Sequence, residues 1–136
     1  MKEIRIDDIQ ISNDKPFVLI AGLNVLEEEK VILEVISKCK QDAEKFKIPY
    51  IFKASYDKAN RSSYSSYRGP GVKKGLAILS ELKRDFNVPV ISDIHTPEEA
   101  ELAAEVLDII QIPAFLSRQT DLILSLIHIS EPTRPI

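Results

Sequence analysis

The sequence predicts an α/β fold: about the first four β/α units of a (β/α)8 TIM barrel, preceded by a β-hairpin. Four short apolar segments each come before a segment with helical periodicity, which is the pattern of parallel β/α units. Polar residues cluster after every apolar segment, as they do at the carboxyl ends of barrel strands, whereas a doubly wound sheet gathers them at one switch point. A whole barrel takes about 250 residues, so 136 residues are expected to hold roughly half of one.

Two strands, a hairpin and a long helix are expected in the first part of the chain. Apolar and polar residues alternate in 4–6 and 9–11, which predicts the hairpin. The continuous apolar run at 17–21 predicts a strand buried on both faces, and 48–52 predicts a second strand. Between them, 27–46 carries apolar residues at helical spacing and begins with three glutamates, which favour the positive end of a helix.

The second part repeats the pattern. An amphipathic helix is expected at 72–86, followed by a strand at 88–91. Thr96 is expected to cap a third helix, because Pro97 stands at its first position and two glutamates follow. Two further elements complete the series, a strand at 107–111 and a helix from 117 to about 124.

The segment after the second predicted strand contains four cations within sixteen positions, Lys53, Lys58, Arg61 and Arg68. Asp57 is the only acid among them, and several serines lie between them. Lysine and arginine are the side chains that bind phosphate and carboxylate groups most strongly. The segment therefore predicts a loop that binds anionic ligands, although a solvated surface loop is the plain alternative.

Composition narrows the class of protein. The formal charge of −3 gives no indication of a nucleic-acid partner or a membrane-surface partner. No stretch approaches the roughly 18 apolar residues that a membrane helix needs, so no membrane association is expected. Cys39 is the single cysteine, which excludes a disulfide within the chain and favours a cytoplasmic location.

Four strings carry a resemblance to a known family: KASYDKANRSS, YRGPG, SDIHTPEEA and IQIPAFLSRQTDL. In this order the chain resembles the 3-deoxy-D-manno-octulosonate 8-phosphate (KDO 8-phosphate) synthase family from about residue 17 to 123. The resemblance implies a TIM-barrel transferase of lipopolysaccharide biosynthesis that condenses phosphoenolpyruvate with D-arabinose 5-phosphate. Two alternatives stay open. One is a non-catalytic phosphosugar-binding fragment, and the other is the related 3-deoxy-heptulosonate 7-phosphate synthase, which uses erythrose 4-phosphate but whose usual motifs do not read KANRSS.

The resemblance also implies roles for individual residues. Lys53 and Lys58 would bind phosphoenolpyruvate, and Asp93 and His95 would form an acid–histidine pair at the end of the third strand. His95 as an ordinary core histidine is the alternative. The residues with an implied catalytic role are Asn24, Lys58, Asp93 and His95. Those with an implied substrate-binding role are Lys53, Ser55, Lys58, Asn60, Arg61, Ser62, Gln111, Ala114, Phe115 and Arg118. Phe115 and Arg118 would reach a neighbouring subunit, because the family is tetrameric.

Asn24 bears on the cofactor. In the family that the chain resembles, members with cysteine at this position bind a divalent metal, and members with asparagine do not need one. An amide is a poorer ligand than a thiolate for a borderline divalent ion. The resemblance therefore implies no metal and no other cofactor, and Cys39 does not replace the missing thiol.

The last thirteen residues, 124–136, do not continue the resemblance. They resemble a translated sequencing adapter, so residues 1–123 are expected to be the native part of one barrel domain and 124–136 a non-native tail. An ordinary divergent C-terminus with a proline-punctuated tail is the alternative. His128 is then no candidate for a site residue. A half-barrel leaves strand edges and apolar surface exposed, so the chain is expected to be marginally stable or to aggregate, and to be inactive by itself.

Overall fold

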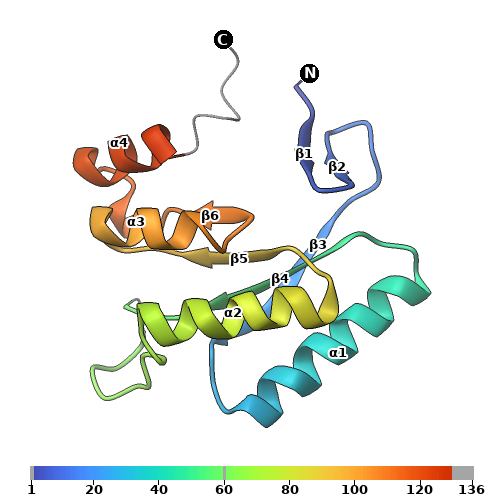
Figure 1. The fold of residues 1–136 in the computed structure, drawn as a ribbon, viewed down its shortest axis with the longest axis horizontal. Helices are drawn as coiled ribbons and strands as arrows, with labels where there is room; N and C mark the ends of the chain where they lie inside the picture. The colour runs from blue at the N-terminus through green and yellow to red at the C-terminus, as the bar shows by residue number, and fades with distance from the viewer. Residues whose placement is uncertain (1, 60, 130–136) are drawn as a thin grey trace.

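A computed structural model of the chain describes residues 2–59 and 61–129. The helices alternate with strands as predicted (Figure 1). In chain order the elements are β1 (Ile4–Ile6), β2 (Ile9–Ile11), β3 (Leu19–Val25), α1 (Glu29–Lys45), β4 (Tyr50–Ser55), α2 (Val72–Phe86), β5 (Val90–Asp93), α3 (Pro97–Ala104), β6 (Ile109–Gln111), the 3-10 helix η1 (Ala114–Leu116) and α4 (Thr120–Ile129).

The four strands that follow the hairpin form one parallel sheet in the order β3-β4-β5-β6, and each strand pairs with the next one along the chain. The hairpin of β1 and β2 is a separate antiparallel pair. Sequential parallel strands connected by helices on one side are the arrangement of the first part of a TIM barrel. The predicted α/β barrel class and the N-terminal hairpin are therefore confirmed.

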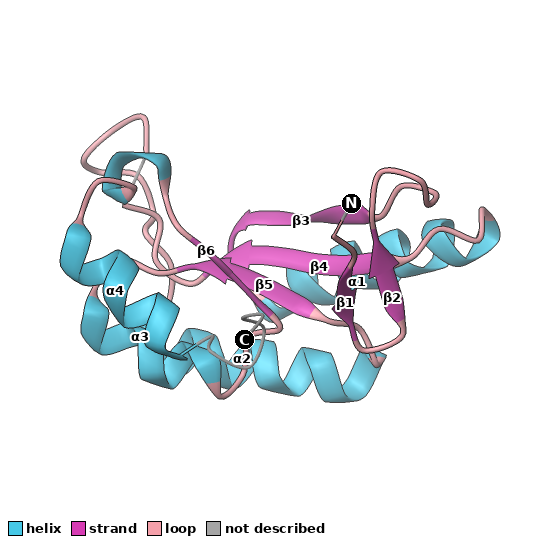
Figure 2. Ribbon diagram, turned by 90° about the horizontal axis from the view of Figure 1, so that it is seen from above, coloured by secondary structure: helices cyan, strands magenta, loops and turns pink. Residues whose placement is uncertain are grey.

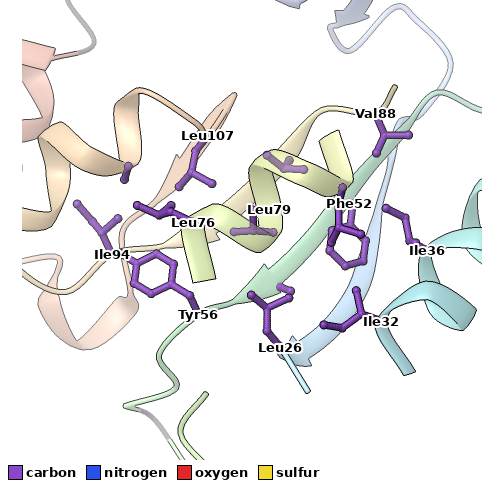
Figure 3. Close-up of a cluster of buried hydrophobic side chains, with 14 of the residues drawn as sticks. Leu26, Ile32, Ile36, Phe52, Tyr56, Leu76, Leu79, Val88, Ile94 and Leu107 are labelled. Carbon is purple, nitrogen blue, oxygen red and sulfur yellow. The ribbon is translucent and has the colours of Figure 1, made fainter. Parts of the chain in front are cut away.

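One face of the sheet is covered by helices and contains the main core (Figure 3). Phe52 and Ala54 of β4, and Tyr56 directly after it, belong to the core on this face and are fully buried. Leu76 and Leu79 of α2 pack in the same cluster, which Figure 3 shows beside Tyr56. Burying a side chain such as Phe52 contributes about 1.5–3 kcal/mol. We call this side the helix-facing face.

The opposite side is the inner face, which would line the interior of a barrel. Alternation along a strand directs Ile51, Lys53 and Ser55 of β4 to this face. Ile51 and Ile91 form a second apolar cluster with Ile9 of the hairpin. Figure 2 shows the hairpin at the end of the sheet where the strands begin. The hairpin therefore closes the amino-terminal end of the inner face, while the carboxyl ends remain open.

Strand boundaries differ from those predicted. Each of the four strands begins two residues later than expected, and the first three also end later. Pro49 and Pro89 come directly before β4 and β5, and proline has no N–H with which to join the ladder. Their carbonyls instead accept hydrogen bonds from Leu19 and Phe52 of the neighbouring strands.

Two further expectations about the elements were wrong. The first strand is not buried on both faces: its burial alternates, and Ile20 on its inner face is 45% exposed because the hairpin does not cover it. The last helix begins at Thr120 instead of 117, since residues 114–116 form a 3-10 turn, and it continues to Ile129. Leu122 and Leu126 of this helix are buried.

Helices α2 and α3 start where the sequence signals predicted, whereas α1 starts at Glu29, two residues later than expected. The hydroxyl of Thr96 accepts a hydrogen bond from the backbone N–H of Glu99 at 3.3 Å, and Pro97 occupies the first turn of α3 as predicted. Helix α2 spans the predicted residues 72–86 and ends at Asn87, which adopts a left-handed conformation with φ 51°. Asn87 thus ends α2 before β5, and the Thr96 cap determines where α3 begins after β5.

Candidate active site

Polar side chains replace apolar ones on the inner face near the carboxyl ends of the strands. Lys53 is paired in register with Gly22 on one side and with Ile91 on the other, and Asp93 is paired with Gln111. Residues paired in this way in a parallel sheet lie side by side on the same face. The sheet thus brings Lys53, Ser55, Asp93 and Gln111 together in one polar row, as predicted from their positions after the apolar runs.

A hydrogen-bonded network joins three of the predicted residues. The Ser55 hydroxyl donates to Oδ1 of Asp93, and His95 Nε2 lies 3.1 Å from Oδ2 of the same carboxyl group. All three side chains are mostly withdrawn from solvent: Ser55 is 1% exposed, and the Asp93 and His95 side chains are 10% and 13% exposed. The acid–histidine pair implied by the sequence is therefore assembled, and His95 does not lie in the apolar core.

Asp93 and His95 shift each other's pKa in the directions that favour their charged forms. Burial by itself would raise the pKa of Asp93, but hydrogen bonds from His95 and Ser55 hold that pKa below its usual value. The hydrogen bond to Asp93 raises the pKa of His95 against the opposing effect of burial. Both directions favour a carboxylate beside an imidazolium, which adds a positive charge to the polar row.

Two buried polar atoms in this region have no hydrogen-bond partner among the described residues, His95 Nδ1 and Gln111 Oε1. Buried polar atoms in native proteins are nearly always paired with protein, water or ligand. Both atoms lie on residues that the sequence assigned to the site. Their unused hydrogen-bonding capacity is consistent with a site that binds a polar ligand.

Lys53 and Lys58 are both half-buried. Within the described residues, neither ammonium group has an acidic partner within 4.0 Å, unlike Lys38, Lys40 and Lys83. Uncompensated lysines at the open end of the inner face are suited to binding phosphate or carboxylate. Lys53, however, lies within β4 and not in the loop where the sequence placed it.

The loop that follows β4 is closed at its neck. Arg68 makes a two-pronged ion pair with Asp57, with Nε–Oδ1 at 2.7 Å and Nη2–Oδ2 at 2.9 Å. The N–H of Lys58 also donates to the carbonyl of Arg68 at 2.6 Å. Gly69 has φ 113°, and a Cβ there would lie 2.5 Å from the carbonyl oxygen of Tyr56. The close approach requires glycine at the end of the loop.

The cations of the loop do not all remain open to a ligand. The Arg61 guanidinium donates to the carbonyls of Ala59 and Tyr64 at 3.2–3.4 Å and lies over the Tyr64 ring. Arg68 is occupied by Asp57. Ser62 is exposed on the same loop, and Asn60 lies outside the described residues.

The remaining predicted residues surround the polar row without a described contact to it. Asn24 is exposed on the inner face of the edge strand β3. Ala114 and Phe115 lie in the 3-10 helix after β6, where Phe115 is 76% exposed, and Arg118 is exposed just beyond it. Among the described residues, no hydrogen bond or ion pair joins any of these four side chains to the acid–histidine pair.

Sequence reasoning missed two residues beside the pair: Glu99, which contacts His95, and Tyr56, which contacts Glu99. Tyr56 and Glu99 are joined by a 2.8 Å hydrogen bond, and Glu99 also accepts from the backbone N–H of His95 at 2.8 Å. A signal for Glu99 was present, because Thr96 and Glu99 have the spacing of a capping box. In that motif the glutamate reaches back to the N–H of the capping residue. Here it reaches one residue further and accepts from the N–H of His95, which places it beside that histidine.

A hollow of about 480 Å³ lies elsewhere, between the hairpin and the amino ends of the strands. Lys15, Lys40 and Tyr50 contribute to its lining, and none of the predicted site residues does. We assign the candidate site to the polar row and the adjoining His95, because the row contains Asp93, the partner of that histidine, and Lys53, which has no acidic partner among the described residues. In the part of the chain that the structure describes, no helix is both long enough and apolar enough to cross a membrane.

Parallel β/α units that gather an acid–histidine pair and lysines at the carboxyl ends of their strands place the chain among the TIM-barrel enzymes. Residues 2–134 match the family model of the DAHP synthetase I family, and the chain belongs to that family. It is also 58% identical over 125 residues to a 2-dehydro-3-deoxyphosphooctonate aldolase of Pseudomonas putida (strain GB-1), covering 92% of this chain and 44% of that protein. The protein of the same name from Hahella chejuensis is 57% identical over 122 residues, 90% of this chain and 43% of its own length.

Similar identities are found with several other Pseudomonas proteins of that name, among them the one from Pseudomonas entomophila at 58%. The chain spans less than half the length of these curated relatives. The resemblance noted in the sequence is therefore confirmed at the level of the family and of its octulosonate-type relatives.

Proposed function

We propose that the whole protein joins phosphoenolpyruvate to D-arabinose 5-phosphate, giving 3-deoxy-D-manno-octulosonate 8-phosphate and inorganic phosphate. The observation that carries the proposal is the acid–histidine pair near the carboxyl ends of the strands, together with Lys53 and Lys58, which have no acidic partner among the described residues. The names of the relatives support an octulosonate product for the same sheet. The pathway would be KDO and lipopolysaccharide biosynthesis.

Each group in the site suits part of this chemistry. Lys53 and Lys58 would hold the carboxylate and phosphate of phosphoenolpyruvate, and Gln111 and Ala114 would line its pocket. Carbon–carbon bond formation joins C3 of the enol to the aldehyde carbon, whose oxygen gains a proton. Water adds at C2, and cleavage of the C2–O bond releases phosphate. A cationic His95 and the lysines would stabilise the negative charge that develops on the departing phosphate.

The sugar substrate would lie against the loop after β4. Arg61, Ser62 and Asn60 are the proposed aldose-phosphate ligands. In the described conformation the Arg61 guanidinium is bound to carbonyls of its own loop, so it would have to exchange those contacts for phosphate. Carbonyl acceptors are neutral, whereas phosphate is an anion that a guanidinium can bind through two parallel N–H···O bonds.

A homotetramer is proposed for the whole protein, with Phe115 and Arg118 reaching the sugar-phosphate site of a neighbouring subunit. Their exposure next to the open end of the inner face supports this. A cytoplasmic location is proposed with it.

By itself, the 136-residue chain is expected to be inactive, since it spans 44% of the length of its relatives. Residues 124–136 remain proposed as a non-native tail, although α4 runs across residue 124, and the part from 130 onward lies outside the described residues.

A metal-independent reaction is proposed from Asn24. Within the described residues, no group of three or more His, Cys, Asp or Glu side chains could hold a metal ion. Asn24 is exposed on the inner face, where its amide could contact a substrate. Chelator treatment of the whole protein is expected to leave the activity unchanged. Loss of activity that a divalent ion restores would contradict the proposal.

A second candidate is the condensation of phosphoenolpyruvate with erythrose 4-phosphate, because the matching family model carries the name DAHP synthetase I. The two reactions can be separated by one experiment. The reading frame is extended through the rest of the barrel, and phosphate release is measured with each aldose phosphate. We expect a higher kcat/KM with arabinose 5-phosphate, and preference for erythrose 4-phosphate would favour the second candidate.

A further inference from the structure

Glu99 and Tyr56 form a buried polar contact that the proposed reaction does not use. Oε2 of Glu99 accepts two hydrogen bonds of 2.8 Å, one from the Tyr56 hydroxyl and one from the backbone N–H of His95. The same oxygen lies 3.9 Å from Nδ1 of the His95 ring. The Glu99 side chain is only 16% exposed. A single carboxyl oxygen therefore faces both the backbone and the ring of His95.

Tyr56 is itself held tightly in place. It is fully buried among the residues of the helix-facing core, beside Ile94 and Leu76 (Figure 3). A Cβ on Gly75 of α2 would lie 2.2 Å from Cβ of Tyr56, and Gly69 approaches its carbonyl oxygen closely. Glycine at both positions lets the chain pack directly against this tyrosine. Its hydroxyl is thus a fixed donor that determines where the Glu99 carboxyl group can lie.

The geometry points to Glu99 as a positioning residue, anchored by Tyr56, that fixes the orientation of the His95 ring against Asp93. The inference rests on the proposed function, because it gives Glu99 a part in the same reaction. One edge of the ring is bound, with Nε2 3.1 Å from Asp93, and the other edge faces the Glu99 carboxyl group, with Nδ1 3.9 Å from Oε2, within electrostatic range but not hydrogen-bonded. Rotation of the ring about its attachment would move both nitrogens away from these carboxyl groups.

The charged groups that face His95 come from three elements. Asp93 belongs to β5, Glu99 to α3 and Asp57 to the neck of the loop after β4. The hydrogen bond to Asp93 contributes most to the raised pKa of His95, and the negative charges of Asp93, Glu99 and Asp57 add to it. Removing the Glu99 charge should therefore lower the pKa of His95 without breaking its contact with Asp93.

The test compares Glu99→Gln with Glu98→Gln in the complete protein. The glutamine keeps a carbonyl oxygen that can accept from Tyr56 and His95, and it removes the charge. Glu98 is exposed in the same turn of α3 and serves as the matched control. We expect Glu99→Gln to lower kcat/KM about tenfold, a small part of the 10²–10⁴ that a positioned acid–base group supplies. We also expect the alkaline limb of its pH profile to move to lower pH, with Glu98→Gln unchanged.

A merely structural role is excluded by a double variant. If Glu99 acts through His95, adding Glu99→Gln to a His95→Asn background should change kcat/KM less than twofold. Tyr56→Phe, which removes only the hydroxyl, should shift the profile in the same direction by a smaller amount and provides a second route if Glu99→Gln folds poorly. An unchanged profile in both variants would overturn the inference, as would a full tenfold loss in the His95→Asn background.

Titration of the His95 ring by NMR separates this inference from the proposed function. The ring should titrate at lower pH in Glu99→Gln than in wild type, whichever substrates the protein uses. A wild-type protein without activity on either aldose phosphate would overturn the proposed function only. An active wild-type enzyme whose His95 titration is unaffected by Glu99→Gln would overturn the positioning role only.

Discussion

The two faces of the sheet differ in what they contribute. On the helix-facing face, Phe52, Ala54 and Tyr56 are fully buried under the helices. On the inner face, the same strand places Ile51 under the hairpin, then Lys53 and Ser55 in the polar row. Successive residues of one strand therefore have different roles. The helix-facing residues stabilise the fold, and the inner residues near the carboxyl ends provide chemistry.

This difference shows that residues needed for stability and residues needed for activity can alternate along a single strand. The side-chain period of a strand is two, so a change at one position leaves the opposite face untouched. Substitutions on the helix-facing face should change stability first, and those in the polar row should change activity first. The following substitutions test that separation, from the largest expected effect to the smallest.

Phe52→Ala should lower the free energy of unfolding by about 3–5 kcal/mol, because it leaves a cavity in the main core. Ile20→Ala is the matched change on the inner face of the neighbouring strand. Ile20 is 45% exposed, so its loss should cost less than about 1 kcal/mol. Urea denaturation of both variants checks the comparison, and equal losses would contradict the division between the faces.

Lys53→Met should lower kcat/KM of the complete protein about 100-fold, or about 2.7 kcal/mol of transition-state stabilisation, while leaving its melting temperature nearly unchanged. Methionine keeps the length of the side chain and removes the charge. Lys73→Met, at an exposed position of α2, is the control and should be close to wild type. A loss of activity that simply follows a loss of folded protein would argue against a role for Lys53 in binding.

Gly75→Ala should destabilise the protein by about 1–3 kcal/mol, since the new methyl group would lie 2.2 Å from Cβ of Tyr56 and force the two elements apart. Ser80→Ala, at an exposed position of the same helix, should stay within about 0.5 kcal/mol. Thermal unfolding of the two variants measures the difference. Wild-type stability in Gly75→Ala would show that Tyr56 is not clamped as described.

The Asp93–His95 pair should make stability depend on pH. Asp93 has a lowered pKa, so its contribution is present above about pH 4 and is lost as the pH falls through the folded value. His95 has a raised pKa, so its contribution is complete below about pH 6.5 and is lost as the pH rises through the folded value. The pair should therefore stabilise most between about pH 4 and 6.5. Urea midpoints across pH 4–9 should show a decline above neutrality that His95→Gln reduces.

Much of the fold could be predicted because its signals are local. The alternation in the hairpin, the helix at 72–86 and the Thr96 cap each depend on a few neighbouring residues, and each is confirmed. The ends of the strands could not be located in this way. The first three strands were ended where their apolar runs stopped, yet Lys53, Ser55 and Asp93 are polar because they line the inner face, and they still belong to β4 and β5.

The candidate site was predictable to the extent that its residues share strand ends. Asp93, Ser55, Lys53 and Gln111 are brought together by the sheet as expected. Contacts that depend on packing between distant elements were not visible in the sequence. The sequence places Tyr56 in the loop after the second strand and Glu99 in the first turn of a helix, and only the packing of α2 and α3 over the sheet joins them.

The closed neck of the loop after β4 affects how the sequence of this loop can evolve. Asp57 and Arg68 join the two ends of the loop, and the Lys58–Arg68 backbone bond does so a second time. The tip near Tyr64 can therefore gain or lose residues without moving the strand or the helix that follow. A doubling of loop length costs only about 0.6 kcal/mol. Within the proposed function, insertion and deletion at the tip is thus a route to new aldose preferences that leaves the sequence of the barrel unchanged.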